Sequence, residues 1–136
     1  MSSLLNDVSI GAITLFTEDL ARSRAFYLDV FGKSVIFEDE NSAVFTFGDV
    51  MINLLALPAA HKLVEPATVA PGGAGPRAVM TVNVDDVDAV CAELAQRGVP
   101  LLNGPVNRPW GIRTASFTDP GGHVWEIAQA APSAGS

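Results

Sequence analysis

Cysteine, histidine and basic residues are scarce in this chain, and each shortage excludes a class of protein. The single cysteine, Cys91, cannot form an internal disulfide or build a thiolate metal site by itself. Because Cys91 falls on the apolar side of an expected helix, we interpret it as a buried structural thiol rather than a nucleophile. The 8 lysines and arginines against 15 acidic residues give a formal net charge of -7, which repels phosphate backbones and anionic lipid. Nucleic acid and membranes are therefore not expected partners.

Long apolar runs are also missing. No segment is long enough to cross a bilayer, and residues 1–7 lack the basic region that precedes the apolar core of a secretory signal. The sequence therefore predicts a cytoplasmic protein. Hydrophobic residues make up 49% of the 136 residues and charged residues 17%, a balance typical of a chain that folds, and the length fits one domain.

What the chain does contain is an internal repeat. Residues 13–20 and 80–87 each read as an alternating strand, an acidic helix cap and an apolar residue. A helix follows each cap, and Gly32 and Gly98 stand where a helix ends in a left-handed residue. Each copy closes with a turn and another alternating strand. The remaining strand candidates lie in between, at residues 34–38 and 43–47 in the first copy and at 101–102 and 114–117 in the second.

Each copy therefore predicts the order β-α-β-β-β. We expect an α+β fold in a single domain, residues 1–136, in which two tandem modules form a cupped mixed sheet with the helices on its outer face. The modules are expected at about residues 8–57 and 78–129. Residues 58–77 are rich in proline and glycine, which break helices and strands, so we interpret them as the linker. Residues 130–136 read as a frayed tail.

The two faces of the expected strands differ in character. One face is apolar and suits packing against the helices, whereas the other is mostly apolar with a few polar groups. Such a mixed face fits the wall of a ligand cavity, and packing against the other half or another subunit would produce the same pattern. The mixed face carries Ala12, Thr14, Phe16, Met51, Asn53, Leu55, Val79, Thr81, Asn83, Val124, Glu126 and Ala128.

Three segments of the chain resemble signatures of the vicinal oxygen chelate superfamily, which contains glyoxalase I, the bleomycin-type resistance proteins and the extradiol dioxygenases. Residues 17–27 are similar to the family's first strand-to-helix signature and residues 84–90 to its second. Residues 109–113 together with 119–127 are similar to the ending of its small bacterial members. The resemblance covers nearly the whole chain outside the linker and tail, and it implies a fold rather than one chemistry.

Metal-dependent members of that family bind a divalent ion through His, Glu or Gln in the first and last strand of each copy. The resemblance places these positions at Ala12, Asn53, Val79 (or Ala78) and Glu126. Only Glu126 is a typical ligand, whereas a catalytic ion needs about three protein ligands. The two histidines lie elsewhere, and His61 in the linker and His123 in a turn both read as surface residues. We therefore expect no cofactor and no metal, a divalent metal with unorthodox ligands being the alternative.

Glu126 is the polar group for which the sequence allows the most roles. Desolvation beside its apolar neighbours favours the neutral acid unless a cation pairs with it. It is a candidate catalytic acid or base, a hydrogen-bond anchor for a ligand, or a carboxylate paired with Arg113. The resemblance places Trp110 and Arg113 in a loop at the cavity mouth, as a stacking surface for a planar ligand and an anion contact. Trp110 packed on its own loop is the alternative, and the greater length of the second copy predicts an extra loop at residues 105–113.

Two hypotheses of function follow. The first is a metal-free small-molecule-binding protein, similar to the bleomycin-type antibiotic-resistance members, that sequesters an aromatic or amphipathic compound, and the resemblance implies a homodimer. The second is an enzyme of the same superfamily, a lyase, isomerase or dioxygenase-like protein that is metal-dependent or uses Glu126 as acid or base. A second catalytic group would then come from Asn53, Asn83 or Arg113. The expected ligand-binding residues are Phe16, Met51, Asn53, Thr81, Asn83, Trp110, Arg113 and Glu126.

Overall fold

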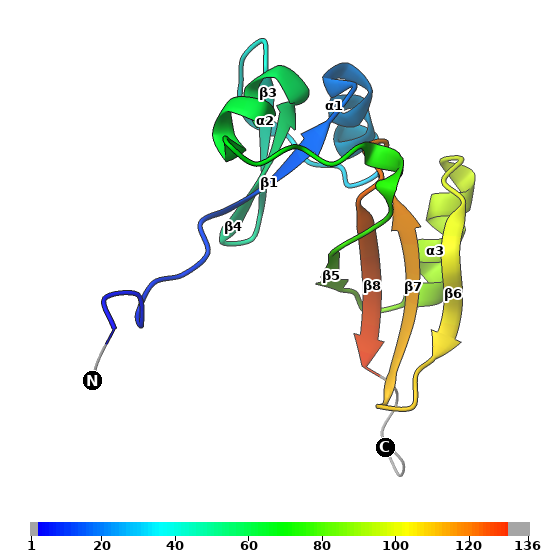
Figure 1. Cartoon of the computed structure of the whole chain (residues 1–136). Helices are drawn as coiled ribbons and strands as arrows, with labels where there is room; N and C mark the ends of the chain where they lie inside the picture. The colour runs from blue at the N-terminus through cyan, green and yellow to red at the C-terminus, as the bar shows by residue number, and fades with distance from the viewer. Residues whose placement is uncertain (1–2, 131–136) are drawn as a thin grey trace. The chain divides into compact units, whose positions relative to one another are not determined.

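The computed structural model describes residues 3–130 and divides the chain into two compact units, Met1–Val69 and Ala70–Ser136 (Figure 1). Each unit holds a four-stranded mixed sheet. The division falls inside the stretch interpreted as a linker, so each unit contains one copy of the sequence repeat. Residues 131–136 of the expected tail lie outside the described residues, whereas Ala130 ends the last strand.

The first unit follows the expected β-α-β-β-β order and adds one helix. Its elements are β1 (Ala12–Thr17), α1 (Leu20–Asp29), β2 (Val35–Glu38), β3 (Ser42–Phe47), β4 (Val50–Ala56) and α2 (Leu57–Val64). In the sheet the strands lie in the order β1-β4-β3-β2, with β1 parallel to β4 and the other neighbours antiparallel. The first and last strands of the repeat are therefore paired.

The second unit repeats this topology. Its elements are the 3-10 helix η1 (Gly72–Ala74), β5 (Val79–Asn83), α3 (Val87–Gln96), β6 (Leu101–Asn107), β7 (Ile112–Thr118) and β8 (Val124–Ala130). The sheet order is β5-β8-β7-β6, with β5 parallel to β8. The α+β fold with two β-α-β-β-β modules is thus confirmed.

Both main helices begin at the aspartates that the repeat predicts. The Asp19 carboxylate accepts a hydrogen bond from the Arg22 N–H at 3.0 Å. The Asp86 carboxylate accepts one from the Ala89 N–H at 3.1 Å. Each cap contributes about 0.5–2 kcal/mol because it satisfies an N–H group that the helix leaves unpaired. At the other end of α3, Gly98 adopts the expected left-handed conformation with φ of 75°.

Each main helix covers one face of its sheet. On the side of α1, Tyr27 is fully buried and stacks on Phe45 of β3 at a centroid distance of 5.5 Å. On the side of α3, Phe117 of β7 and Trp125 of β8 are buried. Cys91 on α3 is half-buried, and this burial raises the pKa of its thiol. A raised pKa suits the structural interpretation of this residue.

The expectation that residues 58–77 contain no helix is wrong. The first turns of this stretch belong to α2, and η1 lies near its end. Pro58 occupies the first turn of α2, where proline fits because the N–H that it lacks has no partner in a helix. Proline here begins a helix instead of breaking one. Among residues 3–130, none of the helices has the length and apolar character needed to cross a membrane.

The strand expected at residues 101–102 and the loop expected at 105–113 are also corrected. Strand β6 continues to Asn107, so the loop before β7 is reduced to residues 108–111. The pairing of β6 with β7 is irregular around Gly104 and Pro105. Because β6 lies at the edge of its sheet, it tolerates both residue types.

Candidate functional site

The face of the second sheet that points away from α3, here called the far face, gathers most of the polar candidates. Strand register defines it, because residues paired across neighbouring strands point to the same side. α3 packs on the opposite face, where its first N–H, that of Val87, donates to Gln129 Oε1 at 2.7 Å. The far face carries Val79, Thr81, Asn83, Val124, Glu126, Ala128, Ile112, Thr114, Ser116 and Thr118.

Glu126 lies near the middle of the far face and is held by Thr81. The two residues are register partners on β8 and β5, and the Thr81 hydroxyl donates to Glu126 Oε1 at 2.9 Å. Val124 and Ala128, the next residues on the same side of β8, are both 5% exposed. Glu126 itself is half-buried, so its second carboxylate oxygen can meet a ligand at the surface of an apolar strip. Asn83 is exposed on the same face.

Arg108 is a residue of the far face that the sequence analysis missed. It follows β6 directly, and its Nε donates to Thr114 Oγ1 at 2.9 Å. Its Nη2 donates to Asn103 Oδ1 at 3.4 Å, a weaker bond. Thr114 is fully buried and points to the far face, so the arginine side chain lies over this face. The only signal for Arg108 in the sequence is its position directly before residues 109–113. The family resemblance of that segment pointed to Arg113 instead.

The approach of β6 to β7 depends on Gly104. A Cβ atom added there would lie 2.5 Å from the Thr114 carbonyl oxygen and 2.8 Å from Ala115 Cα. Gly104 also has a φ of 85°, which side chains disfavour. The glycine therefore permits the close contact that places Asn103 and Arg108 beside Thr114.

Arg113 lies on the other face of the same sheet. Its Nη2 and Nε donate to the two oxygens of Asp88 on α3 at 2.9 Å and 3.1 Å, and its Nη1 donates to Asn107 at 3.0 Å. The hydrogen bond from Arg113 lowers the pKa of the Asp88 carboxyl. Arg113 therefore holds a helix to the sheet, and the pairing of Arg113 with Glu126 considered above is wrong.

Trp110 is 69% exposed in the loop at residues 108–111. Its ring is therefore not packed over this loop, and most of its surface can meet another molecule. Trp125, the other tryptophan, is only 2% exposed.

The candidates of the first unit share the face of the first sheet that points away from α1. Met51 is 39% exposed and Phe16 is half-buried. Asn53 lies opposite Thr14 in the register of β4 and β1. Its Oδ1 atom is buried and has no hydrogen-bond partner among residues 3–130. Thr14 and Asn53 thus occupy in the first sheet the places that Thr81 and Glu126 occupy in the second.

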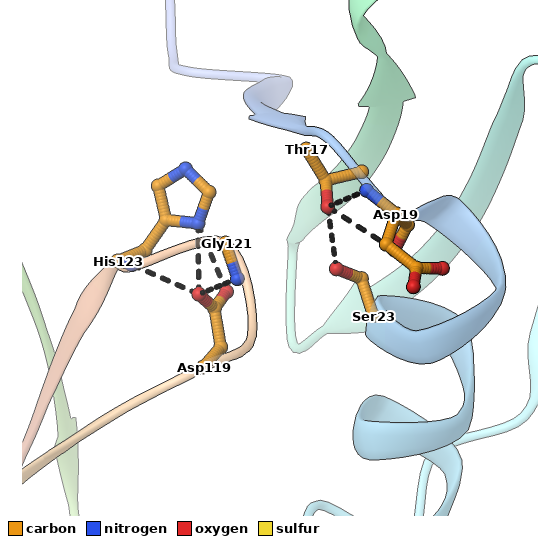
Figure 2. A network of polar contacts seen from close by, with 6 residues as sticks. All are labelled: Thr17, Asp19, Ser23, Asp119, Gly121 and His123. Atoms are coloured by element: carbon orange, nitrogen blue, oxygen red, sulfur yellow. Dashed lines mark hydrogen bonds and ion pairs between the residues drawn. The ribbon is translucent and has the colours of Figure 1, made fainter. Parts of the chain in front are cut away.

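Figure 2 shows two polar networks, one from each unit, in which side-chain oxygens accept hydrogen bonds from backbone N–H groups. In the first unit the hydroxyl oxygens of Thr17 and Ser23 are hydrogen-bonded at 2.7 Å, and the Thr17 oxygen also accepts from the Asp19 N–H at 3.2 Å. In the second, Asp119 Oδ1 accepts from the His123 N–H at 2.9 Å and lies 2.9 Å from His123 Nδ1. His123 is therefore tied to the turn before β8, whereas His61 is exposed on α2.

The residues at the family's metal positions do not fit a divalent ion. Ala12 and Val79 have no donor atom in their side chains, so Asn53 and Glu126 are the remaining donors. Among residues 3–130, no group of three or more His, Cys, Asp or Glu side chains comes together as a metal-binding cluster. A catalytic ion with about three protein ligands is therefore not supported by this donor set.

Comparison with known proteins agrees with the fold. The family model described as Glyoxalase/Bleomycin resistance protein/Dioxygenase superfamily matches residues 9–127. The uncharacterized protein YraH of Bacillus subtilis is 32% identical over 119 residues, which cover 85% of this chain and 93% of YraH.

Solved structures show the same architecture. A glyoxalase/bleomycin resistance protein/dioxygenase from Nocardioides matches with a TM-score of 0.84 and 22% identity, over 95% of this chain and 87% of that one. An antibiotic binding protein from Streptomyces sp. CB03234 matches with a TM-score of 0.71 and 26% identity, over 93% of this chain and 98% of that one. With its two β-α-β-β-β modules and a family match across nearly its whole length, the chain belongs to the glyoxalase/bleomycin resistance protein/dioxygenase superfamily, also called the vicinal oxygen chelate superfamily.

Proposed function

We propose that this protein binds, and thereby sequesters, a small aromatic or amphipathic compound without the help of a metal. The observation that carries the proposal is the far face of the second sheet. There the Thr81–Glu126 pair lies beside two buried apolar residues, Val124 and Ala128. An apolar surface with a few fixed polar groups is the usual character of a small-molecule site.

Two further features support a planar ligand. The exposed ring of Trp110, in the loop before β7, offers a face for stacking. Thr81 fixes one oxygen of Glu126, so the carboxylate is ordered before a ligand arrives, which lowers the entropic cost of binding. The antibiotic binding protein from Streptomyces sp. CB03234 shares this fold, which supports a small-molecule ligand for this chain.

The donor set favours binding over metal chemistry. Sequestration needs affinity alone, whereas the metal-dependent reactions of the superfamily need ligands that Ala12 and Val79 do not provide. We also propose that the protein is cytoplasmic and, from the family resemblance, that it is a homodimer; cell fractionation and sedimentation velocity would test these two proposals.

Tryptophan fluorescence tests the proposal. We would titrate a panel of planar aromatic compounds into the protein and compare it with Trp110→Phe, because Trp125 is buried and supplies a constant background. We expect saturable quenching that Trp110→Phe removes, with one ligand per chain. Absence of saturable binding across the panel would contradict the proposal.

An enzyme that uses Glu126 as acid or base is the alternative outcome. Mass spectrometry of each bound compound after long incubation separates the two functions. A binding protein returns the compound unchanged. Accumulating product that Glu126→Gln nearly abolishes would establish an enzyme, and Glu93→Gln on the exposed side of α3 is the matched control.

A further inference from the structure

We infer that the ligand of the far face carries an acidic group bound by Arg108 and, at its other end, an N–H or O–H group that donates to Glu126. This inference rests on the proposed function and narrows it from aromatic compounds in general to aromatic acids with a distant hydrogen-bond donor.

The partners of Arg108 leave it able to bind an anion. A guanidinium group has five N–H donors in a planar fork. Two hydrogen bonds, to Thr114 and Asn103, hold Arg108 within residues 3–130, and both acceptors are neutral. The side chain is therefore ordered over the far face while its charge has no carboxylate partner in the described part of the chain.

Arg24 and Arg113, the other half-buried arginines, differ in this respect, as does Arg97 at the end of α3. Arg24 pairs with Glu38 at 2.6 Å, Arg97 with Glu93 at 3.5 Å, and Arg113 with Asp88 at 2.9 Å. Each of those charges is already matched inside the protein. Arg108 is held by a buried threonine instead, as expected of a cation whose partner is a ligand.

The two ends of the site are one small molecule apart. Thr114 and Ser116 are neighbours on the same side of β7, and Glu126 lies opposite Ser116 on β8. The diagonal from Thr114 to Glu126 is therefore roughly 7–8 Å between Cα atoms. The other corners of this square are Ser116 and Ala128, whose side chains are small and add little bulk between the two ends. A fused aromatic ring with substituents at opposite ends spans such a distance.

The negative net charge of the chain does not argue against an acidic ligand. At physiological salt the field of distant charges is screened beyond about 8–10 Å. A guanidinium that contacts the ligand acts within hydrogen-bond distance, where screening is weak. The acidic group of the ligand meets the positive charge of Arg108, and its N–H or O–H group meets the negative charge of Glu126.

Two fluorescent probes test the acidic end. The first is 6-(p-toluidino)naphthalene-2-sulfonate, which carries a sulfonate and an amine N–H at opposite ends of a naphthalene ring; the second is the neutral analogue without the sulfonate. We expect the wild-type protein to bind the sulfonate more tightly. We expect Arg108→Gln to lower the affinity for the sulfonate about ten-fold or more, and the affinity for the neutral analogue by less than about two-fold. Arg108→Lys should recover part of the loss, because it keeps the charge without the fork.

Arg97→Gln, at the exposed end of α3, is the matched control and should leave both affinities unchanged. Circular dichroism would show whether each variant is folded. If Arg108→Gln did not fold, the affinity of Arg108→Lys and the salt dependence of sulfonate binding would test the contact with Arg108 instead. If Arg108→Gln lost the same affinity for both probes, or lost affinity for neither, the inference would be overturned and the proposed function would still stand. Failure of the wild-type protein to bind either probe would overturn both.

A competition experiment tests the donor end. Displacement of the fluorescent sulfonate by 6-aminonaphthalene-2-sulfonate is compared with displacement by naphthalene-2-sulfonate, which lacks the amine. We expect the amine to improve binding several-fold in the wild-type protein. Glu126→Met, which keeps the length of the side chain and removes its acceptors, should abolish that advantage. An advantage that persists in Glu126→Met would overturn this part of the inference.

Discussion

Thr81 and Glu126 lie directly opposite each other on β5 and β8, and the threonine hydroxyl donates to the carboxylate at 2.9 Å. The same register sets Thr14 opposite Asn53 in the first sheet. The two modules therefore share a threonine on the first strand of the repeat but differ in the residue that it faces. Only the second module has a carboxylate there, so the proposed acceptor for the ligand lies in that module.

Removing the Thr81 hydroxyl should weaken ligand binding without unfolding the protein. Thr81→Val keeps the shape of the side chain and leaves Glu126 mobile. We expect the affinity for the fluorescent sulfonate probe to fall by about two- to ten-fold, since a hydrogen bond to a charged group contributes about 1.5–3 kcal/mol in a buried site and less in an exposed one. Fluorescence titration measures this change. Thr118→Val, at an exposed position of the same face, is the control, and an equal effect there would refute a specific role for Thr81.

Gly104 should tolerate no side chain. Gly104→Ala introduces a Cβ atom 2.5 Å from the Thr114 carbonyl oxygen at a positive φ, so β6 must shift. We expect the free energy of unfolding to fall by about 1–3 kcal/mol, and the preference for the sulfonate over its neutral analogue to decrease as Arg108 moves. Urea denaturation and probe titration measure the two effects. Gly73→Ala should change neither, because nothing lies within 4 Å of the Cβ that it adds.

Asp119 should be important for stability and unimportant for binding. Its Oδ1 atom accepts hydrogen bonds from the N–H groups of Gly121 at 3.0 Å and His123 at 2.9 Å, and the residue is 5% exposed. Asp119→Ala leaves these donors without their acceptor and should cost about 2 kcal/mol or more. Thermal unfolding followed by circular dichroism checks this. The control is Asp49→Ala in the exposed turn before β4, for which we expect a change within about 0.5 kcal/mol.

The Asp88–Arg113 pair should make stability depend on acid pH. Arg113 lowers the pKa of Asp88 from its ordinary value of 3.8, so the folded protein favours the carboxylate more than the unfolded chain does. The resulting stabilisation is present above pH 3.8 and disappears as the pH falls through the lower folded value. We therefore expect wild type to be more stable than Asp88→Asn near neutral pH, and we expect this difference in stability to vanish only when the pH falls below 3.8 and through the lower folded value. A difference that grows on acidification would contradict the assignment.

Much of the fold follows from local signals in the sequence. Asp19 and Asp86 each mark a helix start through a side-chain hydrogen bond to the third residue that follows, and that interaction needs no tertiary context. Gly98 marks the helix end for a similar reason. The repeat of these signals is what makes two modules predictable. Pro58 misled the prediction because the effect of a proline depends on whether it lies in the first turn of a helix or inside it.

The site was less predictable because it depends on strand register. Arg108 and Arg113 are close in the sequence, yet Arg108 lies over the far face and Arg113 contacts α3. The irregular pairing around Gly104 changes which residues of β6 point to each side, so counting alternate residues cannot decide the face. Glu126 was found because β8 is regular, and its partner Thr81 lies on an equally regular strand.

Metal-free binding on the far face can be tested by a two-dimensional ¹H–¹⁵N NMR titration with the fluorescent sulfonate in the presence of EDTA. We predict saturable amide shifts that gather on the far face, at Thr81, Ser116 and Glu126 and next to Arg108, and that are unchanged when the chelator is replaced by zinc. Shifts that gather on the opposite face around Asp88, or that appear only after a divalent metal is added, would contradict this prediction.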